Sequence, residues 1–252
     1  MLKNLVCSVC EGGCDPLDVV DFNKSCEEVR GKFLPLSGNP VYYYLCNQCG
    51  FCFSPSIYKW KLKDFSKNIY NKQYAEVDPD YELTRPKTNA DNLINAFKDK
   101  EADIKHIDYG GGNGRLSNFL RLSGWNSESY DPFYNETTNI STLGKFNLVT
   151  AFEVFEHVPD VNNLLSDLNL LLEDEGLIIF STLLSDGNIF RHERLNWWYA
   201  SPRNGHISLF SRKSLEILAS KYHFQFASFS HGLHLLFRQQ IPTWAEHIIK
   251  RN

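Results

Sequence analysis

Three groups of residues have the types and the spacing that could carry out chemistry, and the first is a glycine-rich turn. Asp108 is followed by glycines at positions 110, 111, 112 and 114. Glycine allows a turn to adopt positive φ and allows a ligand to approach the backbone closely. Further along stands Asp131, whose carboxylate could accept hydrogen bonds from both hydroxyls of a ribose. The pattern predicts a turn that binds a nucleoside.

The spacing of these glycines distinguishes between two kinds of ligand. A dinucleotide fingerprint reads G-x-G-x-x-G and holds a pyrophosphate at a helix N-terminus, whereas this sequence reads D-x-G-x-G-x-G. The leading acid would repel a pyrophosphate and would favour a sulfonium or ammonium group. A glycine-rich loop without any ligand is the alternative interpretation.

This pattern resembles motif I of class I S-adenosylmethionine (SAM)-dependent methyltransferases, in which the leading acid faces the amino-acid end of the ligand. The resemblance extends over about residues 85–240 and implies SAM as the cofactor. The residues that it places at the cofactor are Asp108, Tyr109, Gly110, Gly112, Asp131, Pro132, Phe152 and Glu153.

A second group of chemical residues follows the apolar stretch 146–152, where the chain reads E-V-F-E-H with Glu153, Glu156 and His157. In open α/β sheets, ligands bind at the carboxyl ends of the strands, so this position suits an active site. His157 could act as a general base, because the pKa of histidine is near neutral. Alternatively, Glu156 and His157 are ordinary residues of a helical first turn, where the dipole favours an acid.

The E-x-x-E-H element resembles one found in ubiquinone-biosynthesis O-methyltransferases and in small-RNA 2′-O-methyltransferases, where it is associated with a bound divalent metal. The resemblance implies catalytic roles for Glu153, Glu156 and His157. It also implies a metal held by these three residues and His206, the position that matches a further histidine of the small-RNA enzymes. Such donors suit Mn²⁺, Fe²⁺, Co²⁺ or Zn²⁺ better than Mg²⁺. The metal could lower the pKa of a substrate hydroxyl.

The third group consists of cysteines near the N-terminus. Two C-x-x-C pairs, Cys7 with Cys10 and Cys46 with Cys49, could bring four thiolates to one tetrahedral Zn²⁺. Glycines that knuckle turns often require follow at positions 12 and 50. Residues 11–45 exceed the usual ribbon spacing and are expected to loop out. Cys14, Cys26 and Cys52 are additional, and a redox C-x-x-C or a set of buried free thiols is the alternative.

Aromatic and basic residues around these groups are candidates for binding the acceptor. Aromatic rings could stack on a planar or sugar face, and guanidinium groups could bind a phosphate. Packing of a cap or core is the alternative for each of them. The acceptor-binding candidates are Tyr70, Tyr74, Arg85, Trp197, Trp198 and Arg203.

The elements that must position these groups follow from the apolar periodicity. Strands are expected at 104–109, in a short segment that ends at Tyr130, at 146–152 and at 177–184. A closing hairpin is expected at 224–230 and 233–238, around Gly232. Helices are expected at 161–173, capped by Gly176, and at 211–221, with Ser211 as the N-cap. Residues 132–145 show no strong strand.

The order of these elements predicts an α/β fold: a Rossmann-like, seven-stranded, mainly parallel sheet with an antiparallel last strand, preceded by a small zinc-ribbon-like module. The 252 residues are expected to divide into a zinc-binding module (1–53), a helical cap or linker (54–100), a methyltransferase domain (101–240) and a tail (241–252).

Composition limits the setting and the partners. A net charge of −4 argues against a nucleic-acid-binding surface. The N-terminus shows no signal peptide, and no apolar run approaches a membrane span, so we expect no membrane partner. Seven cysteines without an export signal indicate a reducing cytoplasm, where metal binding explains thiols better than disulfides do.

Together these features predict a cytoplasmic enzyme that transfers a methyl group from SAM to an oxygen of a small polar acceptor. Cysteine knuckles ahead of such a domain resemble an arrangement in bacterial methyltransferases that act on sugars and surface-glycan precursors, which implies a sugar or a phosphate-bearing acceptor. An RNA 2′-O-methyltransferase is an alternative that the acidic balance disfavours. A cofactor-binding scaffold without turnover is another.

Overall fold

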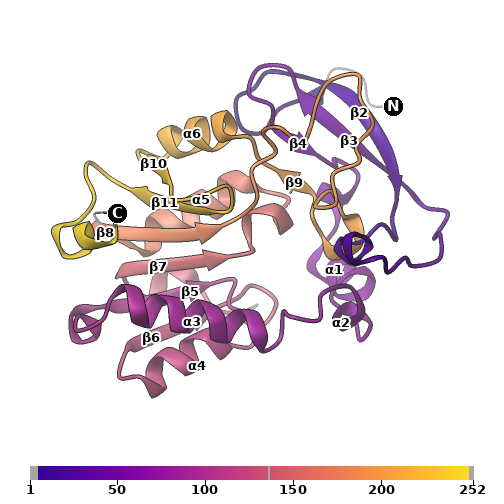
Figure 1. The fold of residues 1–252 in the computed structure, drawn as a ribbon. Coiled ribbons are helices and arrows are strands. Elements are labelled where there is room, and N and C mark those ends of the chain that lie inside the picture. Colours follow the sequence, from indigo (N-terminus) through magenta and orange to yellow (C-terminus); the bar gives the residue numbers. More distant parts are fainter. Residues whose placement is uncertain (1–4, 136, 250–252) are drawn as a thin grey trace. The chain divides into compact units, whose positions relative to one another are not determined.

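The structure is a computed structural model that describes residues 5–135 and 137–249, and the chain divides into two units, each with its own β-sheet (Figure 1). One unit contains the residues up to Pro79 together with Phe155–Asn162 and Thr182–Leu218. The other contains Asp80–Val154, Asn163–Ser181 and the residues from Ala219 onward. Residues 1–4 and 250–252 of the expected first and last segments lie outside the described residues.

The sheet of the second unit has the strand order β10-β11-β8-β7-β5-β6. Strands β6, β5, β7 and β8 pair in parallel, β11 pairs antiparallel with β8, and β10 pairs antiparallel with β11. The mainly parallel sheet and its antiparallel last strand are therefore confirmed. The strands are β5 Lys105–Tyr109, β6 Asn126–Tyr130, β7 Phe146–Phe152, β8 Leu172–Ser181, β10 Gln225–Ser228 and β11 Leu233–Phe237.

The expected count of seven strands is not met, since this sheet has six strands among the described residues. The difference falls on residues 132–145, where the sequence lacks a strong strand signal. There the described residues form the 3-10 turn η4 (Ile140–Thr142), in which Asn139 caps the N–H of Ser141 with its side chain. Polar turn chemistry of this kind competes with strand formation.

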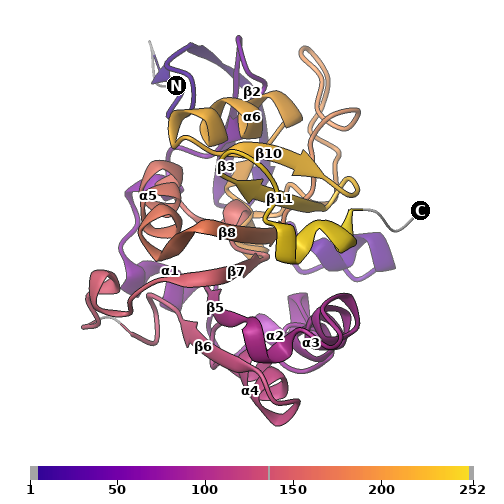
Figure 2. The same cartoon turned by 90° about the vertical axis from the view of Figure 1, so that its left-hand side faces the viewer.

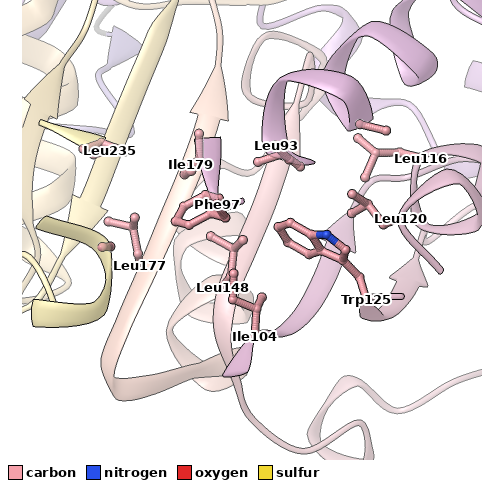
Figure 3. Close-up of a cluster of buried hydrophobic side chains, with 12 residues drawn as sticks. Leu93, Phe97, Ile104, Leu116, Leu120, Trp125, Leu148, Leu177, Ile179 and Leu235 are labelled. Atoms are coloured by element: carbon pink, nitrogen blue, oxygen red, sulfur yellow. The ribbon is translucent and has the colours of Figure 1, made fainter. Parts of the chain in front are cut away.

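One face of the sheet is covered by α3 (Thr84–Ala96), α4 (Arg115–Leu122) and the C-terminal turn η7 (Thr243–Ile248). Figure 3 shows the cluster that joins them, in which Leu93 and Phe97 meet Leu148 and Leu177 of the sheet. Figure 2 shows α5 (Val161–Leu171) on the opposite face. A sheet covered on both faces explains why FNLVTAF is apolar almost throughout instead of alternating.

Of the two predicted helix caps, one is confirmed and the other is wrong. Ser211 caps α6 (Arg212–Lys221), because its Oγ accepts the N–H of Ser214 at 3.0 Å. Gly176, however, does not end α5: the helix ends at Leu171, β8 begins at the next residue, and Gly176 lies inside that strand. A Cβ at Gly176 would come within 2.7 Å of Leu172 Cδ1, so this glycine makes room for a buried leucine.

The first unit contains an antiparallel sheet in the order β1-β2-β3-β4-β9. Its last strand comes from far along the chain, which joins the segment after His206 to the sheet of the cysteine module. The strands are β1 Leu5–Val6, β2 Gly13–Asp21, β3 Pro40–Cys46, β4 Cys52–Phe53 and β9 Ser208–Leu209. The helical elements are η1 Cys26–Arg30, η2 Ile57–Lys59, α1 Leu62–Asn68, α2 Tyr74–Val77, η5 Phe155–His157 and η6 Pro202–Asn204.

The remaining short helical turn of the chain is η3 (Glu101–Asp103), which precedes β5. Throughout residues 5–135 and 137–249, we find no helix with the length and apolar character that crossing a bilayer would require.

Candidate active site

The glycine turn after β5 is tightly packed on one side and open on the other. Gly110, Gly112 and Gly114 have φ of 74°, 56° and 74°, the left-handed region that favours glycine. A Cβ at Gly110 would come within 2.5 Å of Val154 Cγ2, whereas a Cβ at Gly112 would meet no atom within 4 Å. The turn is therefore packed behind Gly110 and open in front of Gly112, where a ligand can approach the backbone.

Asp131 stands at the end of β6 and is joined to this turn. Its Oδ2 accepts the N–H of Gly112 at 3.0 Å, and its Oδ1 accepts the N–H of Phe133 at 2.8 Å. Burial raises the pKa of the carboxyl, and these backbone donors oppose the rise. Each carboxylate oxygen has more than one lone-pair site, so Asp131 fits a ribose with both hydroxyls while it keeps the turn in place.

Asp108 is buried behind the glycines. The hydroxyl of Thr150 on β7 donates to its Oδ1 at 2.6 Å. Burial raises the pKa of Asp108 to about 7, the hydrogen bond from Thr150 opposes this rise, and the charge of Asp131 adds to it. Two acids that face a cation would both ionise more readily, so a sulfonium and ammonium ligand fits the donor set better than a phosphate does.

Three other residues predicted at the cofactor have different surroundings. The hydroxyl of Tyr109 donates to Asp167 Oδ2 at 2.8 Å, so this side chain points into the protein and only its backbone could serve a ligand at the turn. Phe152 packs partly against the hydrophobic cluster of Figure 3. Pro132 is half-buried directly after Asp131.

Glu153, at the end of β7, has an unusual backbone. Its φ is +54°, a left-handed conformation that costs a non-glycine residue about 1–3 kcal/mol. Ser181 at the end of β8 holds it there: the Ser181 hydroxyl donates to Glu153 Oε1 at 2.7 Å and accepts the N–H of Glu153 at 2.8 Å. Backbone strain maintained by specific contacts is common at functional sites.

Glu156, His157 and His206 form a second site, in the first unit. One potential ligand atom from each residue lies within 4.8 Å of the other two. Glu156 is fully buried, and its backbone carbonyl accepts the N–H of Ile207, which ties η5 to the segment before β9. Glu153, which the sequence predicted beside these three residues, is absent from this group of the described residues and instead engages Ser181.

Tyr199 fixes both Glu156 and His206. Its hydroxyl donates to Glu156 Oε1 at 2.5 Å, and its backbone carbonyl lies 2.8 Å from His206 Nδ1. A carbonyl can only accept, so Nδ1 carries the proton and Nε2 keeps its lone pair. Metal-binding and catalytic imidazoles are commonly oriented by such a bond at the opposite nitrogen.

Gly205 allows His157 to approach this site. It ends η6 with φ of +91°, and a Cβ at this position would lie 2.9 Å from His157 Nδ1. The imidazoles of His157 and His206 are 4.9 Å apart between ring centroids, nearly perpendicular to each other. A small residue with positive φ is therefore required beside the pair.

The insertion between the two cysteine pairs also supports this site. Lys24 Nζ donates to the carbonyl oxygens of Trp197 and Ala200, both at 2.7 Å, and these two residues flank Tyr199. Burial lowers the pKa of Lys24, and the charge of Glu28 opposes the effect. The expectation that residues 11–45 merely loop out is thus incomplete, because part of the insertion clamps the segment that orients Glu156 and His206.

Some of the predicted acceptor-binding side chains are accessible, and others are buried or already hydrogen-bonded within the protein. Trp198 is 38% exposed, while Trp197 is buried. Tyr70 is half-buried, 6.2 Å from the His157 ring, and stacks edge-on against the buried Tyr74. The predicted anion-binding role of Arg203 is weakened, because its guanidinium donates to Ile69 O and Asn71 Oδ1.

Arg85, the remaining acceptor-binding candidate, belongs to the second unit and is half-buried near the start of α3. It is the one member of the predicted set that lies outside the unit of the second site. Tyr70, in contrast, is an acceptor-binding candidate whose ring lies close to that of His157, at 6.2 Å between centroids.

The sulfur atoms of Cys7, Cys10, Cys46 and Cys49 lie within 4.8 Å of one another. Two of the pairs are 3.7 Å and 3.4 Å apart, close to the separation of about 3.8 Å that four sulfurs take at about 2.3 Å from a tetrahedral Zn²⁺. Backbone N–H groups of Gln48 and Cys49 point at Cys46 Sγ, as in knuckle turns. None of the seven cysteines, all of which lie within the described residues, forms a disulfide bond.

The two knuckle turns differ from the sequence expectation in one detail. Gly50 has φ of +74°, as predicted, but in the first knuckle the left-handed residue is Glu11, with φ of +62°, and not Gly12. A Cβ at Gly12 would instead collide with the side chain of Gln48 at 2.8 Å, so this glycine provides room between the knuckles.

Sequence reasoning missed the polar residues inside the sheet. His106 is fully buried on β5, with Nε2 2.9 Å from Thr150 Oγ1 and Nδ1 2.7 Å from Ser127 Oγ. A signal was available: His106 and Asp108 alternate along one strand, so both face the same side of the sheet. Tyr199 and Lys24 gave no such signal, because their roles depend on contacts between distant segments.

Residues 81–228 match the family model described as a methyltransferase domain. A ubiquinone biosynthesis O-methyltransferase of Colwellia psychrerythraea is 31% identical over 104 residues, a match that covers 32% of this chain and 42% of the relative's length. Among solved structures, magnesium protoporphyrin IX methyltransferase from Synechocystis PCC 6803 with bound SAH has a TM-score of 0.41 at 16% identity, covering 72% of this chain and 95% of that one. An O-methyltransferase family protein from Burkholderia thailandensis has a TM-score of 0.45 at 11% identity, covering 67% and 60%.

The family match includes the glycine turn, Asp108, Asp131 and the second site up to His206, and it covers more than half of the chain. The chain therefore belongs to this methyltransferase-domain family.

Proposed function

We propose that the protein transfers the methyl group of SAM to an oxygen atom of a small polar acceptor, and that Glu156, His157 and His206 activate this oxygen. The observation that carries the proposal is the double role of Tyr199, which holds Glu156 through its hydroxyl and fixes the Nδ1–H tautomer of His206 through its carbonyl. Packing alone would not require one tyrosine to orient both Glu156 and His206.

The acid–base step assigns the proton to His157. SAM supplies a methyl group on a positively charged sulfur. The acceptor hydroxyl gives its proton to the His157 imidazole, the acceptor oxygen forms a bond to the methyl carbon, and the electron pair of the broken carbon–sulfur bond stays on sulfur. The buried carboxylate of Glu156, 4.0 Å from His157 Nε2, stabilises the imidazolium that forms. The products are S-adenosylhomocysteine and a methyl ether or ester.

The same residues fit a divalent metal. One carboxylate and two imidazoles within 4.8 Å of one another, with the His206 lone pair fixed on Nε2, are a donor set that suits Mn²⁺, Fe²⁺, Co²⁺ or Zn²⁺. Glu156, His157 and His206 would hold the ion, which would lower the pKa of a hydroxyl beside it. Tyr199 would orient two of its three ligands, as outer partners of metal sites commonly do.

For the acceptor we propose a sugar or a phosphate-bearing glycan precursor. The half-exposed ring of Trp198 and the half-buried ring of Tyr70 offer apolar faces of the kind on which sugars stack. The net charge of −4 disfavours a nucleic acid. Because two N–H groups of Arg203 are already paired, a phosphate would depend on other donors.

We also propose that Cys7, Cys10, Cys46 and Cys49 hold a structural Zn²⁺. Their sulfur separations support this assignment, and the binding free energy of a structural zinc would add to the stability of the module around it. Through β4 and β9 the module's sheet continues to the residues directly after His206. Zinc would therefore stabilise the second site as well as the module.

The experiment is a panel of sugars and sugar phosphates offered with SAM, with release of S-adenosylhomocysteine as the readout. Glu156→Gln and His157→Gln should lower turnover by about 10²–10⁴-fold while SAM affinity, measured by calorimetry, stays unchanged. His192→Gln is the matched control, because this histidine is exposed in the same unit. Turnover retained in both site variants would contradict the proposal, and SAM binding without turnover on any acceptor would favour a scaffold.

A further inference from the structure

A continuous row of hydrogen bonds runs across three strands of the sheet and ends at the carboxylate of Asp108. Ser127 on β6 is bonded to His106 Nδ1 at 2.7 Å, and His106 Nε2 to Thr150 Oγ1 at 2.9 Å. Thr150 donates to Asp108 Oδ1 at 2.6 Å. His106 and Thr150 are both fully buried, so water cannot replace either partner without opening the sheet.

The last bond fixes the direction of all the others. If the Thr150 hydroxyl donates to Asp108, its oxygen can only accept from His106, so Nε2 must carry the imidazole proton. Nδ1 then keeps its lone pair and accepts from the Ser127 hydroxyl. Burial lowers the pKa of His106 to about 3, so the ring stays neutral and can take only one of its two tautomers at a time.

We propose that His106 is a positioning residue for cofactor binding, which acts through Thr150 to keep Asp108 ionised and facing the glycine turn. In this arrangement each donor in the row points toward Asp108. When Asp108 takes up a proton, its new O–H donates to Thr150, Thr150 donates to Nε2, and the imidazole proton moves to Nδ1. The tautomer of His106 therefore reports the charge of Asp108.

The row of hydrogen bonds from Ser127 to Asp108 affects the pH range in which SAM binds. The groups that face Asp108 are Thr150 from β7, Ser129 from β6, which lies with Asp108 Oδ2 beside Gly111, and the charge of Asp131. Burial and Asp131 favour the protonated form of Asp108, and only the Thr150 bond opposes them. Loss of that bond should shift the loss of SAM affinity to higher pH.

The experiment measures SAM affinity of the full chain by calorimetry from pH 6 to pH 9. In Thr150→Val and His106→Leu, we expect the midpoint of the pH dependence to rise by about one unit, so that binding weakens about tenfold at pH 6 and less than about twofold at pH 9. His106→Gln keeps a donor toward Thr150 and should stay near wild type. The double variant with Thr150→Val and His106→Leu should bind SAM no more weakly than Thr150→Val alone, because His106 acts through Thr150.

His234→Gln is the matched control. His234 is also fully buried in this sheet, but it lies on β11 and its Nδ1 bonds to Ser228. This variant should leave the pH midpoint unchanged. Equal weakening at every pH in His106→Leu, or effects of the two substitutions that multiply in the double variant, would show a merely structural role and overturn the proposal.

A measurement on the unaltered protein decides the matter if the leucine variant does not fold. Nitrogen-15 NMR of labelled histidine distinguishes the two tautomers. We expect the Nε2–H form of His106 at pH 9 and its replacement by the Nδ1–H form through the same midpoint as the loss of SAM affinity. The Nδ1–H form at pH 9, or a tautomer that does not change with pH, would overturn the proposal.

Discussion

The hydroxyl of Tyr199 donates a hydrogen bond to the buried carboxylate of Glu156. The two residues are far apart in the sequence, and the bond exists because Lys24 and His206 both hold the backbone around Tyr199. A buried carboxylate that loses a donor costs about 1–3 kcal/mol, so the cluster depends on this bond.

Tyr199→Phe removes the hydroxyl but keeps the ring that packs on His206. We expect it to lower turnover by about 10–100-fold, since about 1.4 kcal/mol corresponds to a tenfold change and the bond is worth about 1–3 kcal/mol. SAM affinity should not change. Tyr134→Phe, which removes the hydroxyl of an exposed tyrosine, is the control. Steady-state kinetics checks the expectation, and unchanged turnover in Tyr199→Phe would mean that Glu156 does not need this donor.

Comparing alanine substitutions at two glycines with similar backbone conformations distinguishes the cost of backbone strain from the cost of crowding at the second site. Gly205 and Gly187 have φ of +91° and +77°, but only at Gly205 would a Cβ meet His157, at 2.9 Å, while none is within 4 Å at Gly187. Gly187→Ala should cost about 1–2 kcal/mol from the left-handed backbone alone. Gly205→Ala should cost more and should also lower turnover, because His157 must move. Thermal unfolding and kinetics of the two variants test this, and equal losses of activity would contradict it.

Several features of the fold were predictable from the sequence because their signals are local. The turn after β5, Asp131 at the end of β6 and the Ser211 cap all depend on residues near one another in the chain. Strand β7 was also recognisable, because a sheet covered on both faces requires an apolar run. These features follow from short-range backbone chemistry and from burial.

The second site was predictable only in part. Glu156 and His157 were evident as a pair, but the roles of Tyr199, Lys24 and Gly205 depend on contacts between segments that periodicity does not connect. At Gly176 the local pattern was misleading. Its position after a helical run predicted a helix cap, but the residue lies inside β8, where Leu172 packs over it. Tertiary packing overrides local propensity in such cases.

If the four converging cysteines hold a structural zinc, removal of one of them should unfold the cysteine module. In Cys46→Ser we expect the zinc content to fall from about one ion per chain to near zero, with a lower unfolding temperature, because binding free energy of structural zinc is folding free energy. Cys52→Ala is the matched control, since this thiol is also buried but is not one of the four converging sulfurs. Elemental analysis and calorimetry check the expectation, and equal zinc content in both variants would contradict it.

The raised pKa of Asp108 should make the cofactor-free protein less stable as the pH rises. The carboxyl has a pKa of about 7 in the folded protein and near 3.8 when exposed, so the folded state binds the proton more tightly. Its contribution to stability is full below about pH 4 and is lost as the pH rises through about 7, at up to about 1.4 kcal/mol per pH unit. Asp108→Asn removes this dependence.

The stability of Asp108→Asn relative to the unaltered protein should therefore increase between pH 5 and pH 7 and level off above that range. Urea unfolding at several pH values, without SAM, measures the difference. The stabilisation of the unaltered protein by SAM should have the opposite pH dependence. A cationic ligand stabilises the ionised carboxylate, so SAM should raise the unfolding temperature more at pH 8 than at pH 6. A stability difference that is constant from pH 5 to pH 8 would show that Asp108 is not held in the protonated state by burial.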